Sequence, residues 1–207
     1  MNIINPSFEI ITKINGDEII KKIERAARVC YKSEGHIGNI EKARSFVGAV
    51  IASGHESVIE HEAVTVKVVC DRGVSHEIVR HRLASYSQES TRYCNYEKKG
   101  LTFIKPCFWR DDSKEYDKWF IMMRTIENVY NSMIVEGSRP EEARSILPNS
   151  LKTELIMTMN LREWRHFFKL RTSKLSHPQM REIACPMLDK FKELIPVIFD
   201  DINYEGI

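Results

Sequence analysis

The stretch LKTELIMTMNLREWRHFFKLR, residues 151–171, places a strand pattern directly before a helix pattern. Its first half is strand-like, and we predict a strand over 151–160. From 161 to 171 apolar residues recur at helical spacing on one face, made of Leu161, Trp164, Phe167 and Phe168. The stretch therefore predicts a strand followed at once by an amphipathic helix.

Strand and helix patterns alternate irregularly along the rest of the chain. Further strands are expected at 7–14, 63–70 and 100–106, and helices at about 16–32, 39–53, 73–83, 113–136, 140–147 and from 178 onward. Residues 84–95 are polar and are expected to form a loop. Because the strands are too dispersed for a regular βαβ alternation, we predict an α+β fold in a single domain over residues 1–207.

Composition and charge argue against several classes of protein. The net charge is only +2, which does not favour a nucleic acid or a membrane as partner. The five cysteines are scattered and include no CxxC pair, so we expect reduced thiols rather than a disulfide framework or a zinc ribbon. No signal peptide and no apolar run long enough to span a membrane is apparent. We therefore expect a soluble, cytoplasmic protein.

Residues 80–93, RHRLASYSQESTRY, concentrate arginine and hydroxyl side chains. Arginine donates paired hydrogen bonds that suit phosphate and carboxylate, and hydroxyl groups add neutral donors. The stretch predicts an anion pocket, with a solvated basic turn as the alternative. Arg80 and Arg82 would point about 200° apart on one helix, so either the helix frays there or the two serve different ligands or different subunits.

Arg171 continues the apolar face of the helix over 161–171, because it follows Phe168 by three residues and Phe167 by four. A charge in this position must be paired or face a pocket. We favour a pocket over an arginine that extends to solvent at the helix end. The other side of the helix is expected to carry Arg162, Arg165, His166 and Lys169.

Histidine and glutamate also gather in SGHESVIEHEAV, residues 53–64. His55 and His61 are too far out of helical phase to share one face, and the spacing is not HExxH, so no metal site is predicted. The chain also has no GxGxxG fingerprint, no Walker-A loop and no GxSxG elbow. A nucleotide would therefore be bound without a Rossmann or P-loop motif, and no cysteine lies in a nucleophile signature.

Several of these segments together resemble the flavin-dependent thymidylate synthases, the ThyX family. RHR, followed after seven residues by Ser90, resembles the family signature, and GHESVIEH (54–61) resembles its upstream GHxSxxEH segment. Residues 143–171 resemble its ARxxLP…NxRxxxHFxxLR region, and the HPQ that begins at His177 also matches. The matched segments run in order from about residue 54 to residue 181, whereas the helix at 113–136 has no distinctive match.

The resemblance implies a fold, an assembly and a reaction. The expected fold is a mixed or antiparallel sheet with flanking helices and a helical layer, assembled as a homotetramer whose active sites are shared between subunits. The expected cofactor is FAD, with NADPH and 5,10-methylenetetrahydrofolate as co-substrates. The implied activity is methylation of dUMP to dTMP, in which NADPH reduces FAD, the folate gives a methylene group to C5, and flavin hydride completes the methyl group.

The resemblance also assigns residues to ligands. Flavin-contacting positions correspond to Ser57, Arg80, His81, Arg82, Gln88, Asn160, Arg162 and His166. Positions of the dUMP site correspond to Glu77, Arg80, Gln88, Ser90, Arg92, Arg144 and Arg171, while His55 and Tyr93 lie where the flavin, folate and nicotinamide rings are handled. Arg171 and Ser90 are the expected catalytic residues. Arg171 would stabilise negative charge on the uracil ring from a dry pocket, and Ser90 would position the nucleotide.

Two residues depart from the common family pattern. Ser87 stands where many members have Asn, and Glu77 where many have Gln. An acid at position 77 would repel a phosphate-bearing ligand unless it pairs with Arg80 or with a uracil N–H.

Two other classes of function remain as alternatives. One is a different flavin- or nucleotide-binding oxidoreductase, which would hold FAD without dUMP-dependent turnover. The other is a basic module that binds nucleic acid, whose affinity would fall steeply with salt. Aromatic residues for base stacking are not concentrated in the basic segments, so the sequence does not favour the second alternative.

Overall fold

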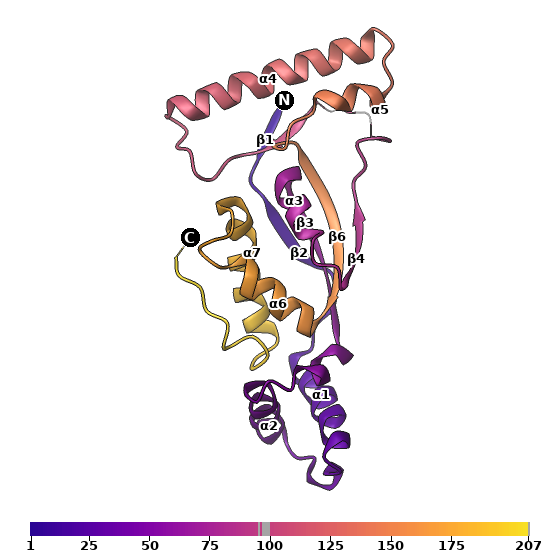
Figure 1. Cartoon of the computed structure of the whole chain (residues 1–207), viewed down its shortest axis with the longest axis vertical. Helices are drawn as coiled ribbons and strands as arrows, with labels where there is room; N and C mark the ends of the chain where they lie inside the picture. Colours follow the sequence, from indigo (N-terminus) through magenta and orange to yellow (C-terminus); the bar gives the residue numbers. More distant parts are fainter. Residues whose placement is uncertain (95, 97–99, 207) are drawn as a thin grey trace. The chain divides into compact units, whose positions relative to one another are not determined.

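The structure, a computed structural model, describes residues 1–94, 96 and 100–206. Its strands are β1 (Asn2–Ile4), β2 (Ser7–Ile10), β3 (Ala63–Asp71), β4 (Ala84–Gln88), β5 (Thr102–Ile104) and β6 (Lys152–Asn160). Its helices are α1 (Gly16–Cys30), α2 (Ile40–Ala52), α3 (Arg72–Ile78), α4 (Lys114–Val135), α5 (Pro140–Ala143), α6 (Leu161–Arg171) and α7 (Pro178–Leu194). Short 3₁₀ turns are η1 (Glu34–His36), η2 (Glu56–His61) and η3 (Arg144–Ile146). Helices and strands are interspersed along the chain (Figure 1), which confirms the α+β class.

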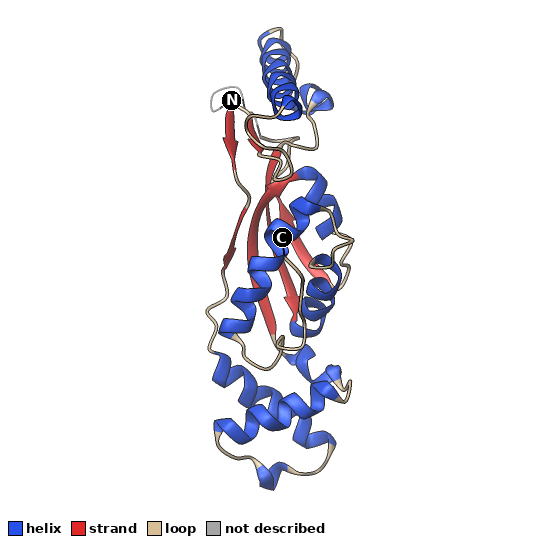
Figure 2. Ribbon diagram, turned by 90° about the vertical axis from the view of Figure 1, so that its left-hand side faces the viewer, coloured by secondary structure: helices blue, strands red, loops and turns tan. Residues whose placement is uncertain are grey.

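The strands form two sheets. β2, β3, β6 and β4 lie in this order in one antiparallel sheet. β1 and β5 pair in parallel, with Asn2 opposite Thr102 and Ile4 opposite Ile104. The expectation of an antiparallel sheet with flanking helices is confirmed (Figure 2).

Among the described residues, no helix combines the length and the apolar character that crossing a membrane requires.

The chain divides into two compact units. Unit 1 comprises residues 1–8, 67–80 and 86–156, and unit 2 comprises residues 9–66, 81–85 and 157–207. The strands β2, β3, β4 and β6 each run from one unit into the other. The single domain expected over residues 1–207 stays a prediction.

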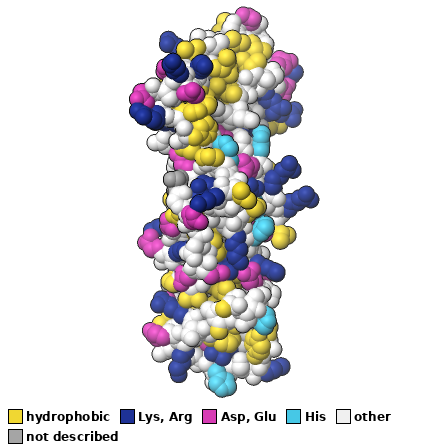
Figure 3. Space-filling model, turned by 60° about the vertical axis from the view of Figure 1, so that its left-hand side comes forward, with side chains coloured by type: hydrophobic (Ala, Val, Ile, Leu, Met, Phe, Trp, Pro, Cys, Tyr) yellow, Lys and Arg dark blue, Asp and Glu magenta, His cyan; other side chains and the backbone are white. Residues whose placement is uncertain are grey.

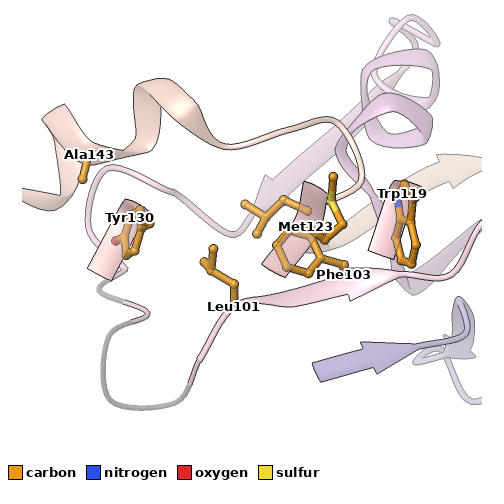
Figure 4. Close-up of a cluster of buried hydrophobic side chains, with 7 residues drawn as sticks. Leu101, Phe103, Trp119, Met123, Tyr130 and Ala143 are labelled. Carbon is orange, nitrogen blue, oxygen red and sulfur yellow. The ribbon is translucent and has the colours of Figure 1, made fainter. Parts of the chain in front are cut away.

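The core of unit 1 forms around helix α4 (Figure 4). Trp119, Met123 and Tyr130 are buried at the spacing of one helix face, and they pack with Leu101 and with Phe103 of β5. The indole N–H of Trp119 donates to Ser150 Oγ at 3.0 Å, so its polar atom is satisfied. Five further side chains of α4 pack partly buried against the same cluster: Tyr116, Phe120, Ile126, Met133 and Ile134. The inward face expected for this helix is confirmed.

Helix α4 also carries a second apolar face. Its members are exposed: Ile121, Met122, Val129 and Val135. They lie within an arc of about 140° on the 3.6-residue repeat, away from the buried face. Figure 3 shows hydrophobic side chains gathered in the part of the surface where α4 lies. Exposed apolar side chains on one side of a helix are typical of a surface that binds a partner.

The core of unit 2 is aromatic. Trp164, Phe167 and Phe168 of α6 are fully buried together with Phe191 of α7. The ring centroid of Phe191 lies 4.8 Å from that of Trp164 and 5.0 Å from that of Phe168. Asn160 begins α6 by accepting a hydrogen bond from the backbone N–H three residues later at 2.9 Å. The apolar face expected for 161–171 is confirmed, and its burial fixes the direction of the opposite, polar face.

The segment that follows α3 differs from the sequence-based expectation. α3 ends at Ile78, so Val79 and Leu83 do not continue its apolar face, and Leu83 is 73% exposed. Residues 84–88, expected as loop, form β4 at the edge of the sheet beside β6. Backbone pairing with β6 orders this strand without an apolar face, and a polar sequence gives no signal of such pairing. Asn95, at the end of the expected loop, lies outside the described residues.

Arg165 is buried, although the sequence placed it on the polar side of α6; the residue is only 1% exposed. Its Nη1 and Nη2 donate to the two carboxylate oxygens of Asp201 at 2.6 and 2.7 Å, and its Nε donates to Glu56 Oε1 at 2.9 Å. It also donates to the carbonyl oxygen of Ile198. A buried guanidinium is tolerated because these acceptors compensate its charge, and none of them is local in sequence.

Candidate active site

The polar face of α6 lines a cavity of about 590 Å³ in unit 2. The lining residues are Glu56, Glu60, Leu83, Asn160, Arg162, Glu163, His166 and Lys169. Three of them, Asn160, Arg162 and His166, are positions that were expected to contact the flavin. Arg162, His166 and Lys169 follow one another by four and by three residues, so helix geometry brings them to one side of α6. The cavity therefore presents several hydrogen-bond donors beside carboxylate acceptors.

The basic side chains of this cavity are held by acids of η2. Arg162 Nη1 lies 2.6 Å from Glu60 Oε1, and Lys169 Nζ lies 3.5 Å from Glu56 Oε1. The hydrogen bond that Arg162 donates to Glu60 raises the pKa of Arg162 above its usual value. The GHESVIEH segment and the NLREWRHF segment, far apart in sequence, thus contribute to the same cavity. Because the cations are held before a ligand arrives, less ordering remains to be done on binding.

His81 connects the first turn of α6 to its last residue. The residue is 4% exposed, and its Nδ1 lies 3.1 Å from Glu163 Oε1. Arg171 Nε donates to His81 Nε2 at 3.1 Å. Burial lowers the pKa of His81; the hydrogen bond with Glu163 opposes this, and the charge of Arg171 lowers the pKa further. His81 is therefore neutral near pH 7. Arg171 has a hydrogen-bond partner, one of the two alternatives for its position, and the pocket that we favoured there stays a prediction.

His81, Glu163 and His166 also bring potential metal-ligand atoms within 4.8 Å of one another. Both ring nitrogens of His81 already have partners, however, and one of these partners is the guanidinium of Arg171. A metal ion would have to displace one partner and would be repelled by the nearby positive charge. The geometry favours a hydrogen-bonded chain over metal binding at this position.

A second cavity, of about 540 Å³, lies in unit 1 beside β4 and β6. It is lined by Lys67, Ser87, Gln88, Glu89, Cys94, Lys152, Glu154, Leu155 and Ile156. Gln88, expected to contact both flavin and dUMP, donates to Ser75 Oγ at 2.9 Å and to Thr153 Oγ1 at 3.2 Å. Ser87, one of the two departures from the family pattern, is also part of the lining. The cavity thus adjoins the segment for which an anion pocket was expected.

Two lysines that the sequence reading did not single out line this cavity. Lys67 Nζ lies 2.6 Å from Glu154 Oε2, and Lys152 Nζ lies 3.0 Å from Glu89 Oε2 and also contacts Glu154. Burial alone would lower the pKa of Lys152, but its hydrogen bonds with Glu154 and Glu89 raise the pKa overall. The alternation of β6 places Lys152 and Glu154 on one face, but only strand pairing brings Lys67 to them.

The other residues of the expected dUMP site are distributed along unit 1. Arg92 Nε donates to Glu141 Oε2 at 3.1 Å, and the backbone N–H of Arg92 donates to Ser90 Oγ at 3.2 Å. Arg144 is exposed in η3, and Tyr93 is 77% exposed. Glu77, the other departure from the family pattern, lies in α3 and is half-buried.

The RHR segment lies beyond the end of α3. Because α3 ends at Ile78, helix geometry does not direct Arg80 and Arg82 to opposite sides. Both side chains are exposed. Ser57 is exposed in η2. His55 Nδ1 lies 2.7 Å from the hydroxyl oxygen of Tyr31, a partner 24 residues away that no motif identified. The roles expected for these residues stay predictions.

Replacing any one cysteine with Ser or Ala is expected to leave the activity that the resemblance implies essentially unchanged in a protein that still folds. Cys70 and Cys185 are buried, and burial raises the pKa of both thiols, which disfavours the reactive thiolate. Cys94 is the sharpest case because it lines the cavity of unit 1. The measurement is the dTMP formation that the resemblance implies, per folded protein, and abolished turnover in a folded Cys94→Ser variant would establish a thiol nucleophile.

Comparison with known proteins identifies relatives over most of the chain. Residues 10–197 match the model of the family described as thymidylate synthase complementing protein. The chain is 36% identical over 190 residues to a flavin-dependent thymidylate synthase of Pyrococcus abyssi, covering 86% of this chain and 78% of that protein. It is also 36% identical over 182 residues to a flavin-dependent thymidylate synthase of Geobacter sulfurreducens, covering 85% of this chain and 78% of that protein.

The fold is also found in a solved structure. A UMP/dUMP methylase, PolB from Streptomyces cacaoi, crystallised with 5-Br dUMP, superimposes with a TM-score of 0.80 over 97% of this chain and 96% of that chain, at 24% sequence identity. The cavity along α6, the ordered motifs and the match over residues 10–197 agree with this likeness of fold. The chain belongs to the family of flavin-dependent thymidylate synthases.

Proposed function

We propose that this protein is a flavin-dependent thymidylate synthase that methylates dUMP to dTMP, with 5,10-methylenetetrahydrofolate as carbon donor and NADPH-reduced FAD as hydride source. The observation that carries the proposal is the cavity along α6, whose lining includes three of the positions expected to contact flavin. Membership of the family and the relatives' names support the same reaction.

The residues of the α6 cavity fit a flavin. Asn160, Arg162 and His166 offer donors and acceptors of the kind that the edge of a flavin ring or a diphosphate requires, and Leu83 adds an apolar surface. FAD, when bound, supplies the hydride that completes the methyl group. The role assigned to the chain is to hold and orient this cofactor, with Arg162 fixed by Glu60 and Lys169 fixed by Glu56.

The nucleotide is assigned to donors of the 88–92 segment and to Arg171. Gln88 is held by Ser75 and Thr153, so its amide is oriented before a ligand arrives. Ser90 and Arg92 provide the hydroxyl and guanidinium groups that a phosphate accepts from. Arg171 is assigned to the uracil ring, where it would stabilise the negative charge that makes C5 nucleophilic; this charge is used up as C5 attacks the methylene carbon.

We propose a homotetramer with active sites shared between subunits as the working assembly. The second apolar face of α4 supports it, because burying such a face against another copy of the chain would be favourable. Arg82 is exposed, as a residue that serves a neighbouring subunit would be. We place the reaction in the cytoplasm, which agrees with five cysteines that form no disulfide.

The purified protein is expected to be yellow, or to become yellow when FAD is added, and to form dTMP only when dUMP, methylenetetrahydrofolate and NADPH are all present. Arg162→Ala should weaken FAD binding by on the order of tenfold, because it removes a charged donor from the cavity. Arg110→Ala, which removes an exposed arginine paired with Asp112, is the matched control and should leave FAD affinity unchanged.

Absorbance near the flavin bands and flavin fluorescence measure FAD binding, and labelled dUMP measures turnover. A protein that does not take up FAD would contradict the proposed function. A protein that holds FAD and oxidises NADPH without dUMP-dependent product would instead be a different flavin oxidoreductase.

A further inference from the structure

Glu163, His81 and Arg171 form a hydrogen-bonded series that spans the length of α6 on one side. Glu163 and Arg171 are eight residues apart, which places their Cα atoms about 12 Å apart along the helix axis and about 80° apart around it. They are too far apart for a direct ion pair of ordinary length. His81 fills the gap, with its Nδ1 3.1 Å from Glu163 Oε1 and its Nε2 3.1 Å from Arg171 Nε.

The donor and acceptor properties of these three side chains allow one arrangement of protons among them. Arg171 Nε always carries a hydrogen, so His81 Nε2 must accept and must have no proton. A neutral imidazole then carries its proton on Nδ1, which donates to the carboxylate of Glu163. The opposite tautomer, or a doubly protonated ring, would place an N–H of His81 against the N–H of Arg171.

The surroundings reinforce this arrangement. His81 is 4% exposed and Glu163 is 7% exposed, so water competes little for either hydrogen bond. The ring of Phe167 lies edge-on to the His81 ring at 5.0 Å between centroids, and that of His166 lies 5.4 Å away. Packing thus restricts rotation of the imidazole, and burial keeps the neutral form of the ring preferred.

We infer that Glu163 and His81 are positioning residues for the synthase reaction: Glu163 fixes the tautomer of His81, and His81 holds the plane of the Arg171 guanidinium toward the uracil. The inference rests on the role proposed for Arg171. The Nε contact sets the plane of the guanidinium and therefore the direction in which its two Nη groups donate. An arginine preoriented in this way avoids the ordering cost at the moment when charge develops on the ring.

A structural role is the competing explanation for Glu163. An acid in the first turn of a helix is favourable whatever it contacts, because it lies near the positive end of the helix dipole. That role predicts an effect on stability alone. The positioning role predicts in addition a change in the tautomer of His81 and a loss in the methyl-transfer step.

The first test reads the tautomer directly in the FAD-loaded wild-type enzyme, through the ring ¹³C and ¹⁵N chemical shifts of selectively labelled histidine. His81, assigned by comparison with a His81→Asn sample, should be neutral at pH 7 with the proton on Nδ1. A proton on Nε2, or a doubly protonated ring, would overturn the inference. Because this measurement needs no turnover, it remains decisive even if the proposed reaction is wrong.

The second test uses Glu163→Gln, which keeps the shape of the side chain but can donate to Nδ1 as well as accept from it. Because its amide can donate to Nδ1, the preference for a proton on Nδ1 should weaken, and a minor Nε2-protonated population should appear although its N–H would face Arg171. The variant's kcat for dTMP formation, measured per bound flavin because Glu163 lines the α6 cavity, should fall on the order of tenfold, and NADPH oxidation without dUMP per bound flavin should fall less. Glu193→Gln, an exposed acid of α7 paired with Lys190, is the matched control and should change none of these.

Glu163→Asp separates positioning from folding. It keeps an acceptor-only carboxylate, so the Nδ1-protonated tautomer should persist while the lengthened contact gives a smaller loss in kcat than Glu163→Gln. An unchanged tautomer and an unchanged kcat in Glu163→Gln would show that Glu163 serves the helix alone. Equal losses of kcat and of FAD content would place it in cofactor binding instead, and either result overturns the inference.

Discussion

Arg171→Ala is expected to lower dTMP formation by on the order of 100-fold or more while FAD stays bound. The guanidinium, held through Nε by His81, is assigned to the uracil ring. There it would donate to a ring oxygen or meet N3 as negative charge builds in the transition state, an interaction worth roughly 3–4 kcal/mol by analogy with oxyanion donors. FAD should be retained because Arg171 is not among the residues that line the α6 cavity.

The measurement is to follow both half-reactions on one flavin-replete preparation. NADPH oxidation without dUMP should suffer less than dTMP formation, since that step involves only flavin and nicotinamide. Arg171→Lys should rescue poorly, because an ammonium reproduces neither the planar fork nor the Nε contact with His81. Equal losses in both half-reactions, or no loss in either, would show that Arg171 is structural.

A mixture of Arg82→Ala and Arg171→Ala subunits is expected to regain activity that neither variant has alone. Arg82 is exposed, whereas Arg171 is half-buried against His81 of its own chain. Suppose that one active site takes Arg82 from one subunit and Arg171 from another. When equal amounts of the two variants assemble at random, about a quarter of the sites then contain both arginines. Activity would then rise from near zero to about a quarter of the wild-type value.

The experiment requires subunits that carry different tags, are dissociated and reassembled together, and are purified through both tags. A mixture of Arg171→Ala with Arg171→Lys is the matched control, because no combination of these subunits restores the arginine. Hybrid oligomers that form but show no recovery would place both arginines of a site on one chain. A fully active monomer would contradict the shared site altogether.

Helix α6 was predictable from the sequence because its signals are local. Asn160 caps it, and apolar residues recur at helical spacing until Arg171, so the bounds 161–171 agree with the structure. The inward face of α4 was predictable for the same reason. Strand β4 was not, because its order comes from pairing with β6 rather than from the pattern of its own side chains.

In the candidate site, too, contacts between residues close in sequence were predictable, and contacts between residues far apart in sequence were not. The family resemblance assigned Asn160, Arg162 and His166 to flavin binding, and helix geometry alone places the last two on one side of α6. The burial of Arg165 was not predictable, because its acceptors Glu56 and Asp201 lie 109 and 36 residues away along the chain.

The sequence by itself determined the α+β class, the helix that carries the site and the family, because these depend on short-range periodicity and on motifs in fixed order. The tertiary structure alone decided which acids hold the basic residues, and that His81, 90 residues from Arg171, lies between it and Glu163. The physical reason is that burial and long-range pairing fix the direction and protonation of a side chain, and neither is encoded in its neighbours along the chain.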